Sequence, residues 1–328
     1  MKYCFWPLVG SSSDESQKVA RHPPDGSPPH CRARRGASSL EMGVLGNASH
    51  AFGFVVGAAL VVRALREQLA ARARRRRRRE IRRVPPGTRV CIYGLSANPP
   101  TDVGGHGTIV HHLRKLFDEV WILPVYRHAF DSKASSLAPY EFRRRMCQLA
   151  FRDSRRPARR DRVKVLDIEK IVVEAALDRA RARGLPLDSV KVGSRAVLAR
   201  VRARNPGVDF AWCLGGDTYA DLREGKWRDH EAFQRECAQV VVPRVGGIDA
   251  LPDLGPNARV LELGDVSEEV SSTTTREMLA ARGEWRRRRG AGDDDEWDGG
   301  EEFDPEVLEE SLRPEVLEYI ESRGLYGA

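Results

Sequence analysis

From residue 89 onward, short continuous apolar runs alternate with stretches of helical periodicity. The apolar runs predict buried strands over residues 89–95, 120–125, 163–168, 209–214, 238–244 and 259–263. Helices are predicted between them, over 105–117, 140–151 and 274–281, where apolar side chains recur on one helix face. Strands that are apolar along their whole length and separated by helices are typical of a parallel sheet covered on both faces. The predicted fold class is therefore α/β, with a doubly wound parallel sheet.

The first 87 residues have a different pattern, and we predict that they form an N-terminal extension, mostly disordered. A Ser-, Pro-, Gly- and Arg-rich stretch over 11–38 cannot bury enough apolar surface to fold. An apolar segment follows at 43–62, close to the roughly 20 apolar residues that a membrane-spanning helix needs. An arginine cluster at 72–83 comes next, and the Pro-Pro-Gly turn at 85–87 marks the start of a globular domain over 88–328.

Charge is distributed unequally between these two parts. The whole chain of 328 residues has a net charge of +8, yet residues 1–87 alone carry +11 and residues 88–328 carry −3. Binding to a phosphate backbone requires a basic face, so we do not expect the globular domain to bind nucleic acid. The basic extension has three explanations that the sequence leaves open: a membrane anchor with the globular domain in the cytosol, an organelle-targeting segment, or an amphipathic helix with a solvated basic face.

Two further features concern residue types. The six cysteines, at 4, 31, 91, 147, 213 and 237, form no C-x-x-C pair, which argues against a disulfide scaffold and a zinc ribbon. Residues 282–305 contain a run of arginines followed by a run of acidic residues. Opposite charges this close in sequence predict a flexible charged insertion in the globular domain.

Polar and glycine-rich loops follow three of the predicted strands, at 94–107, 215–219 and 271–279. The carboxyl ends of parallel strands meet at one edge of the sheet, where ligands of such folds bind. Glycine-rich turns that open helices present amide groups and a helix dipole to an anion, so we predict a nucleotide cradle. His106, at one of these helix starts, could donate a hydrogen bond to a phosphate oxygen. Neither a P-loop nor a G-x-G-x-x-G motif occurs there.

Each loop also has an ordinary structural explanation. Pro99 and Pro100 fit a plain turn, and His106 fits an ordinary first residue of a helix. Thr274 and Glu277 fit a capping box at the start of the helix predicted over 274–281. Capping and phosphate binding are compatible, so the two explanations stay open for these loops.

Together the loops resemble the nicotinate-nucleotide adenylyltransferases of the nucleotidyltransferase superfamily, which have H-x-G-H near the N-terminus and S-S-T-x-x-R near the C-terminus. The resemblance runs from about residue 89 to 326. Between the end motifs, further matches to the family occur in the same order: Pro124, Lys133, Arg143, Met146, Ala150, residues 167–169, residues 214–217, Trp227, residues 241–244, Val316, Tyr319, Ile320, Leu325 and Tyr326.

The resemblance implies a Rossmann-like fold of the nucleotidyltransferase type and an enzyme of NAD biosynthesis. Such an enzyme transfers the adenylyl group of ATP to nicotinate or nicotinamide mononucleotide and releases pyrophosphate. The residues that the resemblance assigns to catalysis are His106, Arg276 and Lys133. Those it assigns to nucleotide and substrate binding are Gly94, Ser96, Asn98, Thr101, Gly215, Asp217, Trp227, Ser271, Ser272 and Thr273. It assigns no protein ligands to a metal, because Mg²⁺ would arrive with ATP and be held by phosphate and water.

The chain departs from the family pattern at three places. Thr101, at the position of the first histidine, is five positions from His106, whereas the histidines of H-x-G-H are three apart. Ala97 replaces a phenylalanine, and residues 191–194 replace a Thr-rich segment. Two alternatives therefore remain: a nucleotidyltransferase with another phosphorylated acceptor, and a catalytically silent nucleotide-binding protein of the same fold. The sequence predicts neither the oligomeric state nor the preferred pyridine form.

Overall fold

The computed structural model describes Arg63, Gln68 and residues 81–127, 137–152, 161–243, 253–263, 270–290 and 304–328. The apolar segment 43–62 and residues 72–80 of the arginine cluster lie outside these described residues. The chain divides into two units, Met1–Leu65 and Arg66–Ala328, and every helix and strand given below belongs to the second. In the described part of the chain, no helix is both long enough and apolar enough to cross a membrane.

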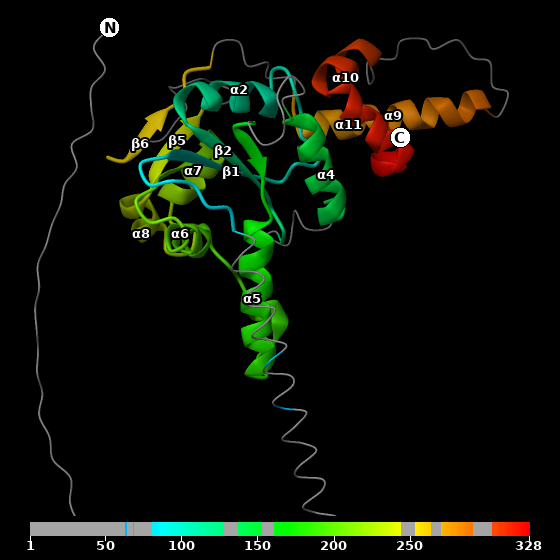
Figure 1. The fold of residues 1–328 in the computed structure, drawn as a ribbon. Coiled ribbons are helices and arrows are strands. Elements are labelled where there is room, and N and C mark those ends of the chain that lie inside the picture. Colours follow the sequence, from blue (N-terminus) through cyan, green and yellow to red (C-terminus); the bar gives the residue numbers. More distant parts are fainter. Residues whose placement is uncertain are drawn as a thin grey trace, which may run out of the picture. The chain divides into compact units, whose positions relative to one another are not determined.

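The centre of the second unit is a parallel sheet (Figure 1). Its strands are β1 (Arg89–Leu95), β2 (Glu119–Pro124), β3 (Val163–Val165), β4 (Asp209–Gly215), β5 (Ala238–Val242) and β6 (Ala258–Val260). The order across the sheet is β3-β2-β1-β4-β5-β6, and every neighbouring pair is parallel. This order confirms the predicted doubly wound α/β fold, in which the chain moves outward in both directions from β1.

The helices of this unit join and cover the strands. They are α2 (His106–Leu116), α4 (Tyr140–Ala150), α5 (Ile168–Ala182), α6 (Ser194–Arg202), α7 (Gly216–Arg223), α8 (His230–Glu236), α9 (Ser272–Gly290), α10 (Pro305–Ser311) and α11 (Pro314–Ser322), with 3₁₀ turns at Leu187–Ser189 and Leu325–Gly327. The predicted third strand is shorter than 163–168, because the chain turns after Val165 and begins α5 at Ile168.

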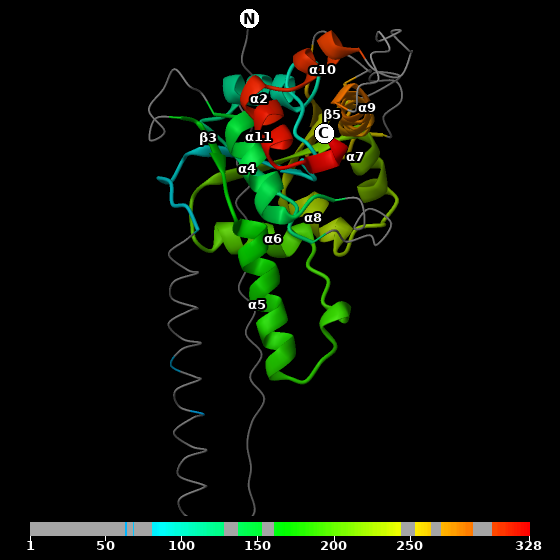
Figure 2. The same ribbon diagram turned by 90° about the vertical axis from the view of Figure 1, so that its right-hand side faces the viewer.

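Two hydrophobic cores lie on opposite faces of the sheet. Side chains alternate along β1, so that Cys91 and Tyr93 enter one core while Val90 and Ile92 enter the other. Helices α2, α4, α9, α10 and α11 cover the first face, and α5, α6, α7 and α8 cover the second (Figures 1 and 2). Burial on both faces explains why the strands are continuously apolar in sequence.

Packing extends the globular unit beyond the boundary expected at residue 87. Ile81 is 2% exposed and belongs to the second core. The Asn205 side chain accepts a hydrogen bond from the amide of Val84 at 3.0 Å and donates one to the carbonyl of Arg82 at 3.1 Å. The chain before the Pro-Pro-Gly turn is therefore tied to the folded unit at least as far back as Ile81.

Helix α9 continues into the stretch where the sequence predicted a flexible insertion. It runs to Gly290, so residues 282–290 are helical, whereas residues 291–303 lie outside the described residues. Glu321 of α11 explains the continuation, because its carboxylate pairs with Arg282 at 3.2 Å and with Arg286 at 3.0 Å. The arginines at the start of the charged stretch are thus partly neutralised by a distant helix.

Candidate active site

The loops after β1 and β4 begin side by side at the carboxyl edge of the sheet. The two strands are neighbours in register, with Tyr93 opposite Cys213, and the chain leaves them toward opposite sides of the sheet. Such a switch point is where ligands bind in doubly wound folds. Gly94 lies near the end of β1, Gly215 ends β4, and Asp217 lies exposed in the first turn of α7.

Thr101 and His106 meet at the start of α2 despite their wide spacing in sequence. Thr101 Oγ1 lies 2.7 Å from His106 Nδ1, and the amide of His106 donates to Thr101 Oγ1 at 3.1 Å. Gly105 makes this contact possible, since a Cβ atom there would lie 2.1 Å from Thr101 Oγ1. The two additional residues of the loop therefore do not separate Thr101 from His106.

The hydrogen bonds at Thr101 fix the form of the His106 ring. The amide of Thr101 donates to Nδ1 at 3.1 Å, which makes Nδ1 an acceptor. The Thr101 hydroxyl accepts from the His106 amide and can donate its own proton to Nδ1. A neutral imidazole with Nδ1 as acceptor carries its proton on Nε2. His106 is therefore built to donate a hydrogen bond from Nε2.

The start of α9 is bonded directly to the loop after β1. Ser272 Oγ donates to the carbonyl of Pro99 at 2.8 Å, and Arg276 Nη1 donates to the carbonyl of Asn98 at 2.7 Å. Arg276 also reaches the carbonyl of Ser272 at 2.9 Å and, through Nη2, Thr273 Oγ1 at 3.2 Å. These bonds bring together the two motifs that lie farthest apart in the sequence.

The capping of α9 differs from the predicted capping box. The helix begins at Ser272, two residues before Thr274, and Ser271 Oγ accepts a hydrogen bond from the amide of Thr274 at 3.1 Å. Thr274 and Glu277 were the predicted pair, but Thr274 already lies in the first turn. The prediction was wrong because the serines preceding it start the helix earlier and satisfy the free amide.

Two residues that the sequence did not assign to the site hold the loop in place. Arg143 of α4 is 2% exposed, and its guanidinium donates to the carbonyls of Ser96 at 2.8 Å and Ala138 at 2.7 Å. Tyr326, two residues from the end of the chain, donates its hydroxyl to Asn98 Oδ1 at 2.9 Å. The sequence signal for the first of these roles is an arginine that shares a helix face with the apolar residues Met146 and Ala150.

Asn98 connects these supports, since it is 3% exposed and each of its oxygens is bonded. Its side-chain oxygen accepts from Tyr326 and from the amide of Ala138 at 2.9 Å, while its carbonyl accepts from Arg276. Asn98 and Thr101, predicted to bind nucleotide, are thus buried residues that shape the loop. Ser96 contributes its carbonyl to the same framework.

Glu169 lies in the first turn of α5, and its carboxylate accepts a hydrogen bond from the amide of Tyr126, just after β2, at 2.9 Å. Burial raises the pKa of Glu169 to about 7, although the amides of Tyr126 and Arg127 oppose the shift. Close by, Tyr126 and Tyr140 pack edge to face with their ring centroids 5.0 Å apart. This edge of the site therefore contains a carboxyl group whose charge changes near neutral pH.

The remaining predicted residues do not meet at one point. Lys133 lies outside the described residues. Trp227 follows α7 and packs against Phe233 of α8, with ring centroids 5.7 Å apart. Of the residues assigned to the site, the structure brings together those of the loop after β1 with Ser272, Thr273 and Arg276 of α9.

The described residues do not offer a protein cage for a metal ion. No group of three or more His, Cys, Asp or Glu side chains gathers among them. Asp102, the carboxylate inside the loop, lies 3.4 Å from the guanidinium of Arg313. A divalent ion bound mainly by phosphate oxygens and water needs no such cage.

The doubly wound sheet and the loop joined to the start of α9 define a nucleotide-binding α/β domain of the nucleotidyltransferase type. Residues 92–278 match the cytidylyltransferase-like family. Over 252 residues, covering 73% of this chain and 97% of the relative, the chain is 31% identical to a "probable nicotinate-nucleotide adenylyltransferase" of Anaeromyxobacter sp. strain K. The chain thus belongs to the cytidylyltransferase-like family and, within it, to the nicotinate-nucleotide adenylyltransferases.

Two further comparisons give the range of similarity. A protein of the same name from Mesorhizobium japonicum is 31% identical over 146 residues, which cover 44% of this chain and 61% of the relative. Among solved structures, the Plasmodium falciparum nicotinic acid mononucleotide adenylyltransferase complexed with NaAD has a TM-score of 0.49 and 17% identity. That match covers 73% of this chain and 97% of the other.

Proposed function

We propose that this chain catalyses adenylyl transfer from ATP to nicotinate mononucleotide, or to its nicotinamide counterpart, in NAD biosynthesis. The products are the dinucleotide and pyrophosphate. The observation that carries the proposal is the junction at the carboxyl edge, where the Thr101–His106 pair opens α2 and Ser272 and Arg276 bind the same loop from α9. Family membership supports the same reaction, since the relatives carry its name.

The proposed reaction needs no nucleophile from the protein. An oxygen of the mononucleotide phosphate attacks the α-phosphorus of ATP, a new P–O bond forms, and the bond to pyrophosphate breaks on the opposite side. The attacking group is already an anion, so catalysis consists of alignment and of stabilising charge on the phosphate oxygens.

His106 is proposed to stabilise this developing charge. Its Nδ1 accepts hydrogen bonds from Thr101, so Nε2 carries the ring proton and is the atom proposed to donate to a phosphate oxygen. The position of His106 at the first residue of α2 adds the positive end of the helix dipole. A donor oriented before the substrate binds loses little energy to reorganisation during the reaction.

The start of α9 is proposed to hold the β- and γ-phosphates. Ser271, Ser272 and Thr273 supply hydroxyl groups there, and Arg276 supplies a cation one turn further on. Nη1 of Arg276 is bonded to two backbone carbonyls, so the guanidinium positions the loop as well as contributing charge. We assign a second cation to Lys133 and the nucleoside and pyridine contacts to Asp217 and Trp227, on the family resemblance alone.

The decisive experiment uses the purified full-length protein with ATP, Mg²⁺ and either nicotinate or nicotinamide mononucleotide. Chromatography measures the dinucleotide, and a coupled phosphatase assay measures pyrophosphate. We expect equal amounts of the two products with at least one acceptor. A folded protein that binds ATP but forms no dinucleotide with either acceptor would instead support the silent nucleotide-binding alternative.

The N-terminal extension is proposed to determine where the enzyme resides, through either membrane anchoring by residues 43–62 or organelle targeting. A fluorescent fusion of residues 1–87 tests both. Membrane or organelle fluorescence is expected, and uniform fluorescence throughout the cytosol would contradict both.

A further inference from the structure

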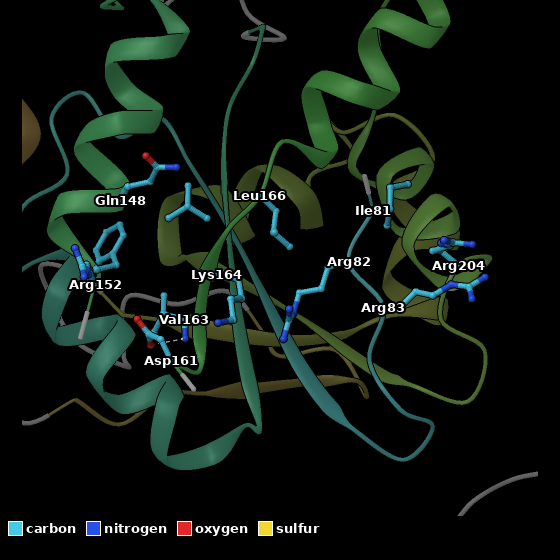
Figure 3. A pocket seen from close by; sticks show the side chains of 12 residues that line it. Ile81, Arg82, Arg83, Gln148, Arg152, Asp161, Val163, Lys164, Leu166 and Arg204 are labelled. Carbon is cyan, nitrogen blue, oxygen red and sulfur yellow. Dashed lines mark hydrogen bonds between the residues drawn. The ribbon is translucent and has the colours of Figure 1, made fainter. Parts of the chain in front are cut away.

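A cavity lies at the β3 edge of the sheet, away from the loop that joins α2 and α9. Its volume is about 490 Å³, within the range of small-molecule sites. The walls come from the chain before β1, the end of α4, strand β3 with its flanking residues, and Arg204 just beyond α6 (Figure 3). Four separate segments of the sequence therefore contribute to one hollow.

The cavity follows β3 from Asp161 before the strand to Leu166 after it, and part of its wall lies at the amino ends of the strands. Helices that follow parallel strands run back toward the amino ends, so the end of α4 lies near the start of β3. Gln148 and Arg152 come from that helix end, and Ile81 and Arg82 precede β1. Arg82 is bonded to Glu119, the first residue of β2, which places this wall at the amino ends. The loops of the active site leave the carboxyl ends.

The cavity is strongly basic. Its walls contain Arg82, Arg83, Arg152, Lys164 and Arg204, with Asp161 as the carboxylate of the lining. Arg82 is neutralised by Glu119, its Nε lying 2.6 Å from Oε2. Asp161 uses one oxygen to accept a hydrogen bond from the amide of Val163 at 2.9 Å. Arg83, Arg152, Lys164 and Arg204 thus add four further cations to a lining that holds one carboxylate.

Two of these cations lack a balancing charge in the part of the chain that the structure describes. Arg83 and Arg152 are both exposed, and neither guanidinium forms an ion pair with a described residue. Figure 3 shows Arg82 and Lys164 in the middle, with Arg83 and Arg204 on one side and Gln148 and Arg152 on the other. Positive charge is therefore spread along the cavity and suits a ligand with several anionic groups.

The pKa of Lys164 is affected by the positive charges around it. Burial and the positive charge of Arg82 lower the pKa of its ammonium group, although Asp161 and Glu119 act in the opposite direction. A bound anion would relieve this repulsion. The lining also has an apolar part, from the buried side chains of Ile81, Phe151 and Val163, which suits an uncharged portion of a ligand.

We propose that this cavity is a second ligand site, separate from the catalytic one, that binds a phosphorylated small molecule with more than one phosphate group. Lys164 binds one phosphate in the middle, and the guanidinium groups of Arg83 and Arg152 bind phosphate at the two sides. Guanidinium groups form paired, charge-assisted hydrogen bonds with phosphate oxygens, which gives both affinity and orientation.

The test measures local hydrogen exchange of the full-length protein with inorganic tripolyphosphate as the probe. Local exchange is needed because the active site and the arginines at 72–79, outside the cavity, are also expected to attract this anion. We expect added protection in peptides covering residues 148–152 and 163–166. No added protection there, while peptides covering 94–101 and 271–276 become protected, would overturn the proposal.

Two double variants distinguish a specific binding site from nonspecific attraction of the anionic probe to positive charge. Arg83→Gln with Arg152→Gln removes two exposed cations from the cavity. We expect the tripolyphosphate concentration that gives half-maximal protection of residues 163–166 to rise about tenfold. The matched control, Arg179→Gln with Arg183→Gln, removes two exposed cations at the end of α5 and should leave it unchanged. Equal weakening by both pairs would show nonspecific attraction and contradict a site.

A second arm identifies the source of the phosphate. Phosphatidylcholine vesicles containing a phosphorylated inositol lipid replace tripolyphosphate in the same exchange experiment. Protection of residues 163–166 by the soluble probe alone assigns the site to a metabolite, and protection by the vesicles assigns it to a lipid headgroup. Protection by neither probe overturns the site. Adenylyl transfer without probe should be normal in the Arg83/Arg152 variant, since neither residue belongs to the catalytic machinery.

Discussion

The two edges of the sheet contrast in how they are prepared for an anion. At the carboxyl edge, the polar groups of the loop after β1 are joined in a hydrogen-bonded framework, as with Thr101 and His106 or Arg276 and Asn98. At the amino edge, cations are abundant, and Arg83 and Arg152 form no ion pair with a described residue. The first edge is suited to aligning reacting groups, and the second to binding charge.

This contrast agrees with the physical demands of the two tasks. A transition state is stabilised by donors already held in position, so an active site invests in a hydrogen-bonded framework. A binding site for a highly charged ligand gains affinity from summed charge, and its side chains can adjust to the ligand. The hydrogen-bonded loop after β1 is therefore a better guide to the catalytic site than the net charge of the chain.

The largest effect is expected at His106. His106→Ala removes the Nε2 donor and should lower kcat by about 10² to 10³, as does removal of a comparable donor elsewhere. Initial rates of dinucleotide formation measure the effect, and circular dichroism checks the fold. His112→Ala, which removes a histidine on the same helix whose Nδ1 lies 3.0 Å from the carbonyl of Thr108, is the matched control. Near-normal turnover of His106→Ala would remove this residue from the mechanism.

Gly105→Ala tests whether the carboxyl edge depends on its framework. The new Cβ would lie 2.1 Å from Thr101 Oγ1, so the Thr101–His106 contact must open. We expect a stability loss of about 1–3 kcal/mol by denaturant titration, together with reduced kcat. Gly193→Ala is the control, because its Cβ would meet atoms of Arg228 at ordinary contact distances of 3.5 Å and 3.6 Å. Unchanged activity in Gly105→Ala would show that the pair is dispensable.

Glu169 should make stability depend on pH. Its pKa in the folded chain is raised to about 7, so the folded state retains a proton that the unfolded chain releases near its ordinary value of 4.5. Wild-type stability therefore falls as pH rises between these values. Glu169→Gln lacks this loss and should gain about 3 kcal/mol relative to wild type between pH 4.5 and pH 8.

Thermal melts across this pH range measure the difference between Glu169→Gln and wild type. Glu310→Gln, at an exposed carboxylate of α10, controls for the loss of one negative charge. A difference in Tm that stays constant with pH would contradict a raised pKa at Glu169.

The smallest effect is expected from the end of the chain. Tyr326→Phe removes the hydroxyl that donates to Asn98 Oδ1, at a cost of about 1 kcal/mol in stability. The loop that Asn98 anchors should loosen, which raises the KM for ATP severalfold with little change in kcat. Tyr319→Phe is the control, since that ring packs against Phe142 in the same C-terminal region. Identical KM values in the two variants would limit Tyr326 to a structural role.

Much of the fold could be predicted from the sequence, because apolar periodicity is a local property that burial imposes directly. The six strands and the helix that follows β1 occur where the pattern placed them, with shifts at the ends such as the early start of α5 at Ile168. The capping of α9 was misassigned, because several consecutive hydroxyl residues can each cap a helix and only packing selects among them.

Sequence alone also indicated the family, through motifs whose order along the chain is preserved, and placed the polar loops at one edge of the sheet. The tertiary structure decided that Thr101 and His106 touch across a widened loop, and that Arg143 and Tyr326 support it from distant helices and from the chain end. It also gathered Arg83, Arg152 and Arg204 around one hollow. Local sequence patterns determine helices and strands, because the spacing of apolar residues along the chain sets which side chains can be buried together. Contacts between residues that are far apart in sequence depend on how those elements pack.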